Sequence, residues 1–210
     1  MSNDAEILAL AELDSGFTHA ENLHLFIDDV LKKAGVQTGE LEAVAVSRGP
    51  GSYTGLRIGA STAKGLAYAL KIPLIAVDTL MIMSEMARQQ NGEASFYCPM
   101  LDARRMEVYT AVHDVNLGTV MPVEALIVNA ETAGKLNMDN ICFFGDGMDK
   151  CRELLSGMKN VSFIENIKPS AKYMGALAAK RHKSKQFEDV AYFEPFYLKD
   201  FLIVKKGTET

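Results

Sequence analysis

The sequence has no tryptophan and only three cysteines, which are too few and too far apart for the usual cysteine-based sites. Cys98, Cys142 and Cys151 are odd in number and show no CxxC or Cys/His ligand spacing, which disfavours a disulfide framework and a zinc site. Cysteines of this kind are typical of small buried apolar side chains in a reducing compartment. We therefore expect a cytoplasmic protein that folds without covalent or metal cross-links.

Long apolar runs are also absent. The longest candidate, residues 65–77, contains Lys71 and Pro73, so the sequence predicts no membrane span. The first residues lack a basic region, and the apolar stretch from Ile7 is broken at Glu12, which argues against a signal peptide. With 48% hydrophobic residues among 210, the chain has enough apolar material for one sizeable core or two small lobes.

The sequence has fewer basic than acidic residues. The chain has 22 Lys and Arg against 27 Asp and Glu, a formal net charge of -5. Binding to phosphates requires a face dense in Lys and Arg, so any contact with RNA is expected to be indirect. The basic run at 180–185 is interpreted as the solvated end of a helix, where cations complement the helix dipole.

Hydrophobic periodicity in the first half predicts an α/β layer protein. Thr18 and Glu21 form a capping-box pattern before a one-sided apolar helix, and Gly35 follows as a stop signal. In chain order, the pattern predicts a strand at 7–12, a helix at 19–34, a strand at 43–47, a glycine-rich loop at 48–55, a helix at 58–70, a strand at 74–77 and a helix at about 80–90.

The second half is less regular. A soft boundary at 92–95 divides the chain into an N-terminal lobe, 1–93, and a C-terminal lobe with a terminal tail, 94–210. Within the second lobe, the pattern predicts strands at 96–101 and 107–112 around a turn at 102–104, a buried strand at 141–144, and helices at about 148–155 and 171–181.

The glycine-rich loop is the most informative segment and the candidate cofactor-binding site. Its candidate residues are Gly49, Gly51, Ser52, Thr54 and Gly55. Glycines permit close approach of another group, and amides at the following helix start attract an anion such as phosphate. The same glycines also suit a tight strand-to-helix turn that serves packing alone, and the pattern leaves both interpretations open. The loop matches neither a Walker A sequence nor the GxGxxG dinucleotide spacing.

At this loop the sequence resembles a known family. Residues 47–59, SRGPGSYTGLRIG, are similar to the signature of the TsaB (YeaZ) family, and further matching segments follow in the family's order at 61–67, 73–80, 102–109, 145–147 and 195–199. The resemblance implies an actin/Hsp70-like ATPase fold with two ribonuclease H-like lobes. It also implies a non-catalytic scaffold subunit that binds the catalytic paralogue TsaD, with the ATPase TsaE, for threonylcarbamoyladenosine formation at position 37 of tRNAs reading ANN codons.

The sequence departs from the family's pattern at its start. Family members begin with a strand that carries an Asp-Thr-Ser type motif, and nothing before Asp4 supplies it. We therefore expect the N-terminal lobe to lack this first strand and the first phosphate loop of the ATPase superfamily. That loss disfavours nucleotide binding, and no cofactor is expected.

Catalytic and metal-binding residues are not expected either. In the catalytic relative, the segment matching 78–83 supplies two metal-binding histidines, whereas this chain has Thr79 and Met83 there. Neither side chain suits that ligand role. Asp78 and Asp102 follow strands and could serve chemistry, but a helix cap and a turn are the simpler structural roles. The alternative functions are a stand-alone actin/Hsp70-like ATPase, a metallopeptidase, or a direct tRNA-binding module.

The resemblance places the partner interface on the first two helices. The candidate residues are Leu23, Phe26, Ile27, Gly59, Ala63, Ala67 and Tyr68. The second helix carries two small-residue stripes, at 59, 63, 67 and at 61, 65, 69, which suit close approach of another helix. The sequence leaves open which stripe faces outward. The expected partners are TsaD and TsaE, with a homodimer when the chain is alone, indirect contact with tRNA and no membrane.

Overall fold

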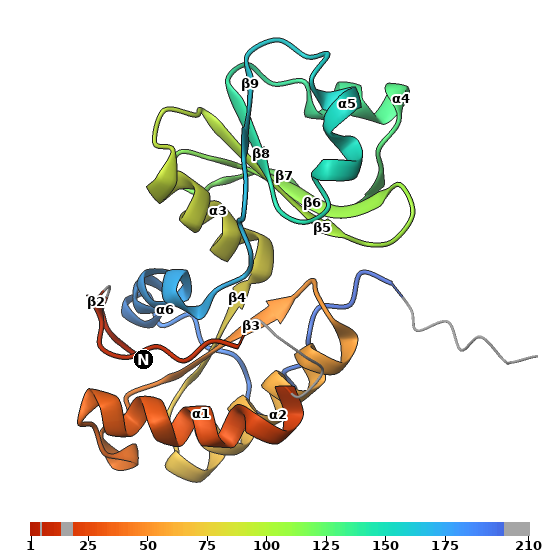
Figure 1. Ribbon diagram of the computed structural model, residues 1–210. Helices are drawn as coiled ribbons and strands as arrows, with labels where there is room; N and C mark the ends of the chain where they lie inside the picture. Colours follow the sequence, from red (N-terminus) through yellow and green to blue (C-terminus); the bar gives the residue numbers. More distant parts are fainter. Residues whose placement is uncertain (5, 14–18, 200–210) are drawn as a thin grey trace, which may run out of the picture.

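The N-terminal part of the structure is built on a two-stranded parallel sheet. The structure is a computed structural model that describes residues 1–4, 6–13 and 19–199, with the side chains of 19–22 also outside the description. Strand β3 (Val44–Gly49) pairs with β4 (Leu74–Asp78). Helices α1 (His19–Ala34) and α2 (Tyr53–Leu70) lie together along one side of this sheet (Figure 1), and a 3-10 turn, η1 (Thr38–Glu40), follows α1.

Alternation of side chains gives β3 and β4 two apolar faces, as expected for a parallel sheet covered on both sides. On one face, Val46, Leu74 and Ala76 pack against the alanines of α2. On the other face, Ile75 and Val77 pack against helix α6 (Met174–Lys183). The segment 188–193 also reaches this sheet, because Glu188 bridges to Leu74 and Phe193 joins the core under α2.

The other lobe is a five-stranded mixed sheet in the order β7-β6-β5-β8-β9. Its strands are β5 (Phe96–Asp102), β6 (Glu107–Asp114), β7 (Thr119–Ile127), β8 (Ile141–Phe144) and β9 (Val161–Ile164). The β7-β6-β5 pairs are antiparallel, and β5-β8-β9 are parallel. This order is that of a ribonuclease H-like lobe.

Helix α3 (Thr79–Gln90) joins the lobes, since Leu80, Met83 and Ala87 pack beneath Tyr97 and Phe144 of the larger sheet (Figure 1). The opposite face of that sheet is covered by short elements. These are α4 (Ala130–Ala133), η2 (Gly134–Leu136), η3 (Asp149–Cys151) and α5 (Arg152–Leu155); another short turn, η4 (Ala171–Tyr173), leads into α6. No helix among the described residues combines the length and apolar character needed to cross a membrane.

Most predicted elements are confirmed within a few residues. Helix α1 has the predicted bounds, and α3 and strands β3, β4, β5, β6 and β8 lie where periodicity placed them. Helix α2 begins five residues earlier than predicted because Ser52 caps it, accepting a hydrogen bond from the Gly55 amide (3.4 Å). The helices predicted at 148–155 and 171–181 each begin with a 3-10 turn. The Thr18 and Glu21 capping box lies outside the described residues.

The strand predicted at 7–12 is wrong. Only Glu6–Ile7 forms a strand, β2, and it pairs with β1 (Ser2–Asn3). The amides of Leu8 and Ala9 turn back onto the Met1 carbonyl instead of pairing with β3. Strand pairing needs a neighbour with a matching row of amides and carbonyls. Strand β3 does not pair with this segment, because a cavity of about 570 Å³ lies between the N-terminal hairpin and residues 43–45.

The lobe boundary at 93/94 remains a prediction. The link between α3 and β5 does fall there, but α6 and residues 188–193 come from the second half of the chain and pack on β3 and β4. We propose that the larger sheet and its short covering helices form one lobe, and that α6 and the tail belong structurally with the first sheet.

Candidate functional site

The glycine-rich loop is closed against the C-terminal tail. Gly49 has φ +113 and precedes a cis peptide to Pro50. A Cβ atom at Gly49 would lie 2.8 Å from the Phe196 carbonyl oxygen and 3.1 Å from Leu56 Cδ1, so only glycine fits there without displacement. The Phe196 amide also donates to the Arg48 carbonyl (2.7 Å). The requirement for glycine at this position is therefore a packing requirement.

The remaining loop residues are more open. Gly51, Ser52 and Thr54 are exposed, and a Cβ at Gly51 would meet nothing within 4 Å. The Ser52 hydroxyl already serves as the cap of α2, and a Cβ at Gly55 would make only ordinary contact with Ser52. Binding of an anion by this loop stays a prediction, because a free helix start alone does not define a ligand site.

Polar side chains meet at the carboxyl ends of β3 and β4, where open α/β sheets commonly place their sites. Arg48 Nε lies 2.7 Å from Asp78 Oδ1, and Arg181 approaches the other Asp78 oxygen at 3.7 Å. The hydroxyls of Ser47 and Thr79 are 2.7 Å apart. Asp78 stands at the N-cap position of α3 but makes no side-chain cap bond. Its observed role is a structural ion pair that ties strand ends to α6.

The two positions that would have to be histidine in the catalytic relative are enclosed. The Met83 side chain is fully buried in the core under the larger sheet, and Thr79 is 5% exposed. Among the described residues, no three or more His, Cys, Asp or Glu side chains are arranged to hold a metal ion. The donor set at this place is therefore one hydroxyl and one thioether, which does not suit a hard metal ion.

A buried histidine lies near the lobe junction. His113 is 2% exposed, and its Nδ1 lies 2.8 Å from the Ser84 hydroxyl of α3. Burial lowers the pKa of His113 to about 4, although Asp78 and Asp114 act in the opposite direction. The imidazole is thus neutral near pH 7 and links α3 to β6 by a hydrogen bond.

The β5–β6 turn has the hairpin predicted from the sequence. The Ala103 amide donates to the Glu107 carbonyl (3.0 Å), and Asp102 accepts from the Arg104 amide (2.9 Å). The hydrogen bond from Lys150, helped by the Arg104 amide, lowers the pKa of Asp102. Asp102 is therefore engaged in holding the turn and the segment around Lys150 together.

The structure decides the orientation of α2. Ala60, Ala63 and Ala67 are at most 5% exposed and pack on the sheet beneath, and Gly59 faces Val46. Three of the candidate interface residues, Gly59, Ala63 and Ala67, are therefore covered by the chain's own strands. The exposed small stripe is the second one, Ser61, Gly65 and Ala69. The first stripe is covered because Val46, Leu74 and Ala76 of the sheet and Phe193 of the tail pack against it.

The other candidate interface residues border this exposed stripe. Tyr68 is 80% exposed on α2, and Leu25 of α1 is 55% exposed. Leu23, Phe26 and Ile27 are half-buried on α1, which contacts α2. A Cβ at Gly65 would meet nothing within 4 Å, so this part of α2 is open to a close neighbour. The two helices together present exposed small and apolar side chains.

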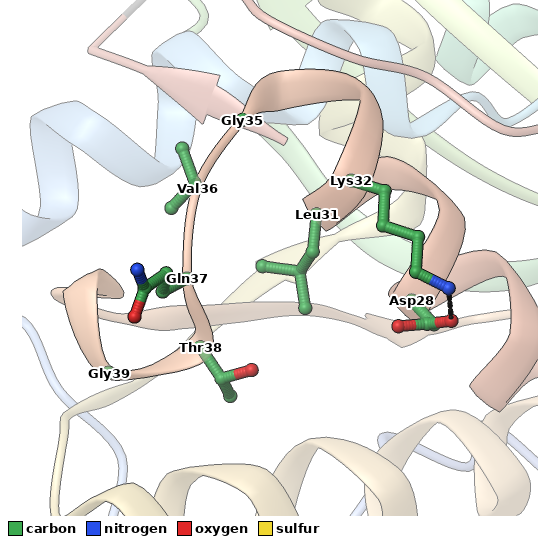
Figure 2. A pocket seen from close by; sticks show the side chains of 8 residues that line it. All are labelled: Asp28, Leu31, Lys32, Gly35, Val36, Gln37, Thr38 and Gly39. Atoms are coloured by element: carbon green, nitrogen blue, oxygen red, sulfur yellow. Dashed lines mark hydrogen bonds and ion pairs between the residues drawn. The ribbon is translucent and has the colours of Figure 1, made fainter.

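A hollow lies at the far end of α1 (Figure 2). It is bounded by Asp28, Leu31 and Lys32 on the helix and by residues 35–39 after it, with a volume of about 470 Å³. The only polar pair in it is Asp28 with Lys32, at 2.5 Å, one helical turn apart (Figure 2). The hollow has no convergent set of donors or acceptors, so its geometry suggests no chemistry.

Sequence reasoning missed the part played by the tail. Lys64 Nζ donates to the carbonyls of Ala191 and Phe193, both at 3.0 Å, and Lys199 forms an ion pair with Glu107 of β6. The tail therefore runs from α2 past the glycine-rich loop to the other lobe (Figure 1). The resemblance of segment 195–199 to the family was the one sequence signal for a role of the tail. Its contacts could not be predicted, because they involve residues far away in the sequence.

With this geometry in place, comparisons with known proteins define the class. The family model described as "TsaD: tRNA N6-adenosine threonylcarbamoyltransferase" matches residues 15–203, and the chain belongs to that family of actin-like α/β proteins. Within it, the relatives place the chain in the TsaB (YeaZ) group.

Two relatives and one solved structure illustrate this likeness. The tRNA threonylcarbamoyladenosine biosynthesis protein TsaB of Haemophilus influenzae is 29% identical over 90% of this chain and 83% of its own length. TsaB of Escherichia coli is 41% identical over 44% of this chain and 40% of its own. YeaZ from Pseudomonas aeruginosa superimposes with a TM-score of 0.73 at 26% identity, covering 88% of this chain and 87% of that one.

Proposed function

We propose that this chain is a non-catalytic scaffold subunit in tRNA threonylcarbamoyladenosine biosynthesis, and that it binds a TsaD catalytic paralogue, with TsaE joining the pair. The modification concerned is the one at position 37 of tRNAs reading ANN codons. The names of the relatives support the pathway. Enzymes described as tRNA N6-adenosine threonylcarbamoyltransferase also match part of the chain, one of them at 43% identity over 60 residues.

The observation that carries the proposal is the exposed face formed by α1 and the outward stripe of α2. Ser61, Gly65 and Ala69 offer almost no side-chain bulk, so another helix can approach the α2 backbone closely. Tyr68 lies next to the stripe on α2, and Leu25 adds an exposed apolar side chain on α1. A self-complementary surface of this kind also suits a twofold homodimer when the partner is absent.

The donor set supports the proposed lack of catalytic chemistry. Thr79 and Met83 occupy the places where the catalytic relative needs imidazoles, and Met83 is fully buried. His113 is held neutral within the lobe junction. These side chains offer neither metal ligands nor an accessible general base, which favours the scaffold over the metallopeptidase and ATPase alternatives.

Gly65→Arg tests the docking surface. Its side chain enters open space, so the melting temperature of the isolated chain should change little, whereas co-purification with TsaD should be lost. Gly134→Arg is the matched control, because a Cβ there also meets nothing within 4 Å but lies in the other lobe. Retention of TsaD by a folded Gly65→Arg variant would place the docking surface elsewhere.

A further inference from the structure

A run of aromatic rings and cations crosses the surface beside the glycine-rich loop. The rings of Tyr53 and Tyr197 lie 5.1 Å apart, the Arg57 guanidinium stands 5.4 Å from the Tyr53 ring centre, and the Arg48 guanidinium 5.9 Å from that of Phe196. Three segments, the end of β3, the start of α2 and the tail, thus build one patch. We call Arg48, Tyr53, Arg57, Phe196 and Tyr197 the aromatic–arginine patch.

These rings are unusually open for their size. Tyr53, Phe196 and Tyr197 are 38–40% exposed, although large aromatic side chains are normally much more buried. At the end of the patch, Lys199 places its ammonium 6.0 Å from the ring centre of Tyr109 and continues the alternation of ring and cation onto β6. Partly exposed rings alternating with cations are the arrangement on which unstacked nucleic-acid bases stack while phosphates are neutralised.

The charge balance of the patch differs from that of the whole chain. Arg48 and Lys199 are paired with Asp78 and Glu107, but no carboxylate of the described residues pairs with Arg57. At the tail, burial raises the pKa of Tyr197; Tyr53 and Glu194 act in the same direction, and the charge of Arg57 opposes them. The Arg57 guanidinium donates to the Tyr53 hydroxyl (3.4 Å), so on this local surface a phosphate would meet a cation held by a ring and not by a carboxylate, although the whole chain has a net charge of -5.

The patch is also continuous with the proposed docking stripe. Tyr53 and Arg57 precede Ser61, Gly65 and Ala69 at steps of four residues, and all five are exposed. Neighbouring residues four apart lie on adjacent turns, and since each step turns by about 40°, the row winds slowly around the exposed side of α2. The exposed face of α2 thus has an aromatic, basic beginning and a small-residue remainder, which suit two different ligands.

We propose that the aromatic–arginine patch binds a single-stranded segment of tRNA directly, with a base stacked on Tyr197 and Tyr53 and a phosphate held by Arg57. This inference rests on the proposed function, which makes tRNA the substrate of the assembly. It replaces the expectation of purely indirect tRNA contact with a local, weak and salt-dependent contact. Stacking tolerates any base, so the contact positions the RNA without reading its sequence.

The test is fluorescence anisotropy with a labelled anticodon stem-loop RNA, using the full chain alone and in complex with TsaD, at low and at physiological salt. A blunt-ended RNA duplex with the same number of nucleotides serves as the second probe. Wild type should bind the stem-loop more tightly than the duplex, and binding should weaken as salt rises. Tyr197→Ala and Arg57→Ala should each weaken binding by about tenfold.

Matched controls lie outside the patch. Tyr192→Ala removes an 83% exposed tyrosine of the same tail, and Lys180→Ala removes an exposed cation of α6. Both should bind the stem-loop as wild type does. Equal affinity for the two probes, equal loss in the controls, or unchanged binding by the patch variants would overturn the proposal.

Co-purification separates this proposal from the scaffold proposal. Tyr197→Ala and Arg57→Ala should retain TsaD, whereas Gly65→Gln, which adds bulk without a charge, should lose TsaD and keep the isolated chain's own RNA binding. If the patch variants lose TsaD or TsaE without any RNA present, the patch is a protein-docking surface and the RNA proposal is refuted. If Gly65→Gln keeps TsaD while the patch variants lose RNA, the scaffold surface fails and the RNA contact stands.

Discussion

Replacement of Gly49 by alanine should destabilise the protein much more than the same change two residues later. The new Cβ would stand 2.8 Å from the Phe196 carbonyl oxygen, a backbone atom that cannot swing aside, and 3.1 Å from Leu56 Cδ1. The φ of +113 adds strain for any side chain. Backbone strain of about 1–3 kcal/mol and overpacking of about 1–3 kcal/mol give a loss of roughly 2–6 kcal/mol.

Thermal and urea unfolding of Gly49→Ala and Gly51→Ala provide the assay. For a chain of this size, each kcal/mol lowers the melting temperature by about 2–4 °C, so Gly49→Ala should melt at least about 4 °C below wild type. Gly51→Ala, which meets nothing within 4 Å, should melt close to wild type. Equal stability of the two variants would refute the account of the loop as a packing device.

A truncated chain that ends before Pro195 separates the two contributions. In that background the Phe196 carbonyl is gone, so Gly49→Ala should retain only the backbone strain and the contact with Leu56. Gly49→Ala should therefore lower the free energy of unfolding less in the truncated chain than in the full chain. The difference between the two losses is the coupling energy between loop and tail. An unchanged penalty would show that the tail does not press on Gly49.

Three further outcomes are expected. Ala67→Glu buries an unpaired charge at a position 1% exposed and should cost at least about 3 kcal/mol by urea unfolding, whereas Ala69→Glu on the exposed stripe should be nearly neutral. Burial lowers the pKa of His113 from 6.5 to about 4, so between these pH values the unfolded state binds more protons than the folded state. The free energy of unfolding should therefore fall by up to about 3 kcal/mol as pH drops from 6.5 towards 4. His113→Gln should reduce this pH dependence. Lys64→Met removes the donor to two tail carbonyls, so limited proteolysis should cut the tail faster than in wild type.

The elements that sequence patterns predicted well are those whose stability depends on local signals. Helix α1 shows clear one-sided periodicity and ends at Gly35, whose φ is +67, and the β5–β6 hairpin has its turn where the sequence placed it. Strand β7 was missed because Pro122 lies inside it, and proline weakens a strand assignment. The sheet tolerates Pro122 because β7 is an edge strand, where a missing backbone amide need not break a pairing hydrogen bond.

The candidate site was predictable in composition but not in orientation. Two small-residue stripes on α2 were evident from the sequence, yet which one faces outward depends on how β3 and β4 fill the space beneath Ala63 and Ala67. The glycine-rich loop was recognised as an unusual backbone path, but the atom that requires glycine at Gly49 belongs to Phe196, at the other end of the chain. Contacts of this separation leave no periodic trace in the sequence.

The two proposed surfaces lie on the same helix, and their short separation affects the expected RNA affinity. At 1.5 Å per residue, Arg57 lies about 12 Å along the helix from Gly65, so a subunit docked at Gly65 comes within roughly one Debye length of the patch at 0.1 M salt. Basic groups of that subunit would then add to the potential at Arg57, which alone must act against a chain of net charge -5. The stem-loop should therefore bind the complex more tightly than it binds either subunit, and Arg57→Ala should reduce that gain. Gly65→Gln, which adds bulk at the same position without a charge, should abolish the gain while leaving the chain's own weak affinity unchanged, because it separates the subunits without altering the rings or the guanidinium groups.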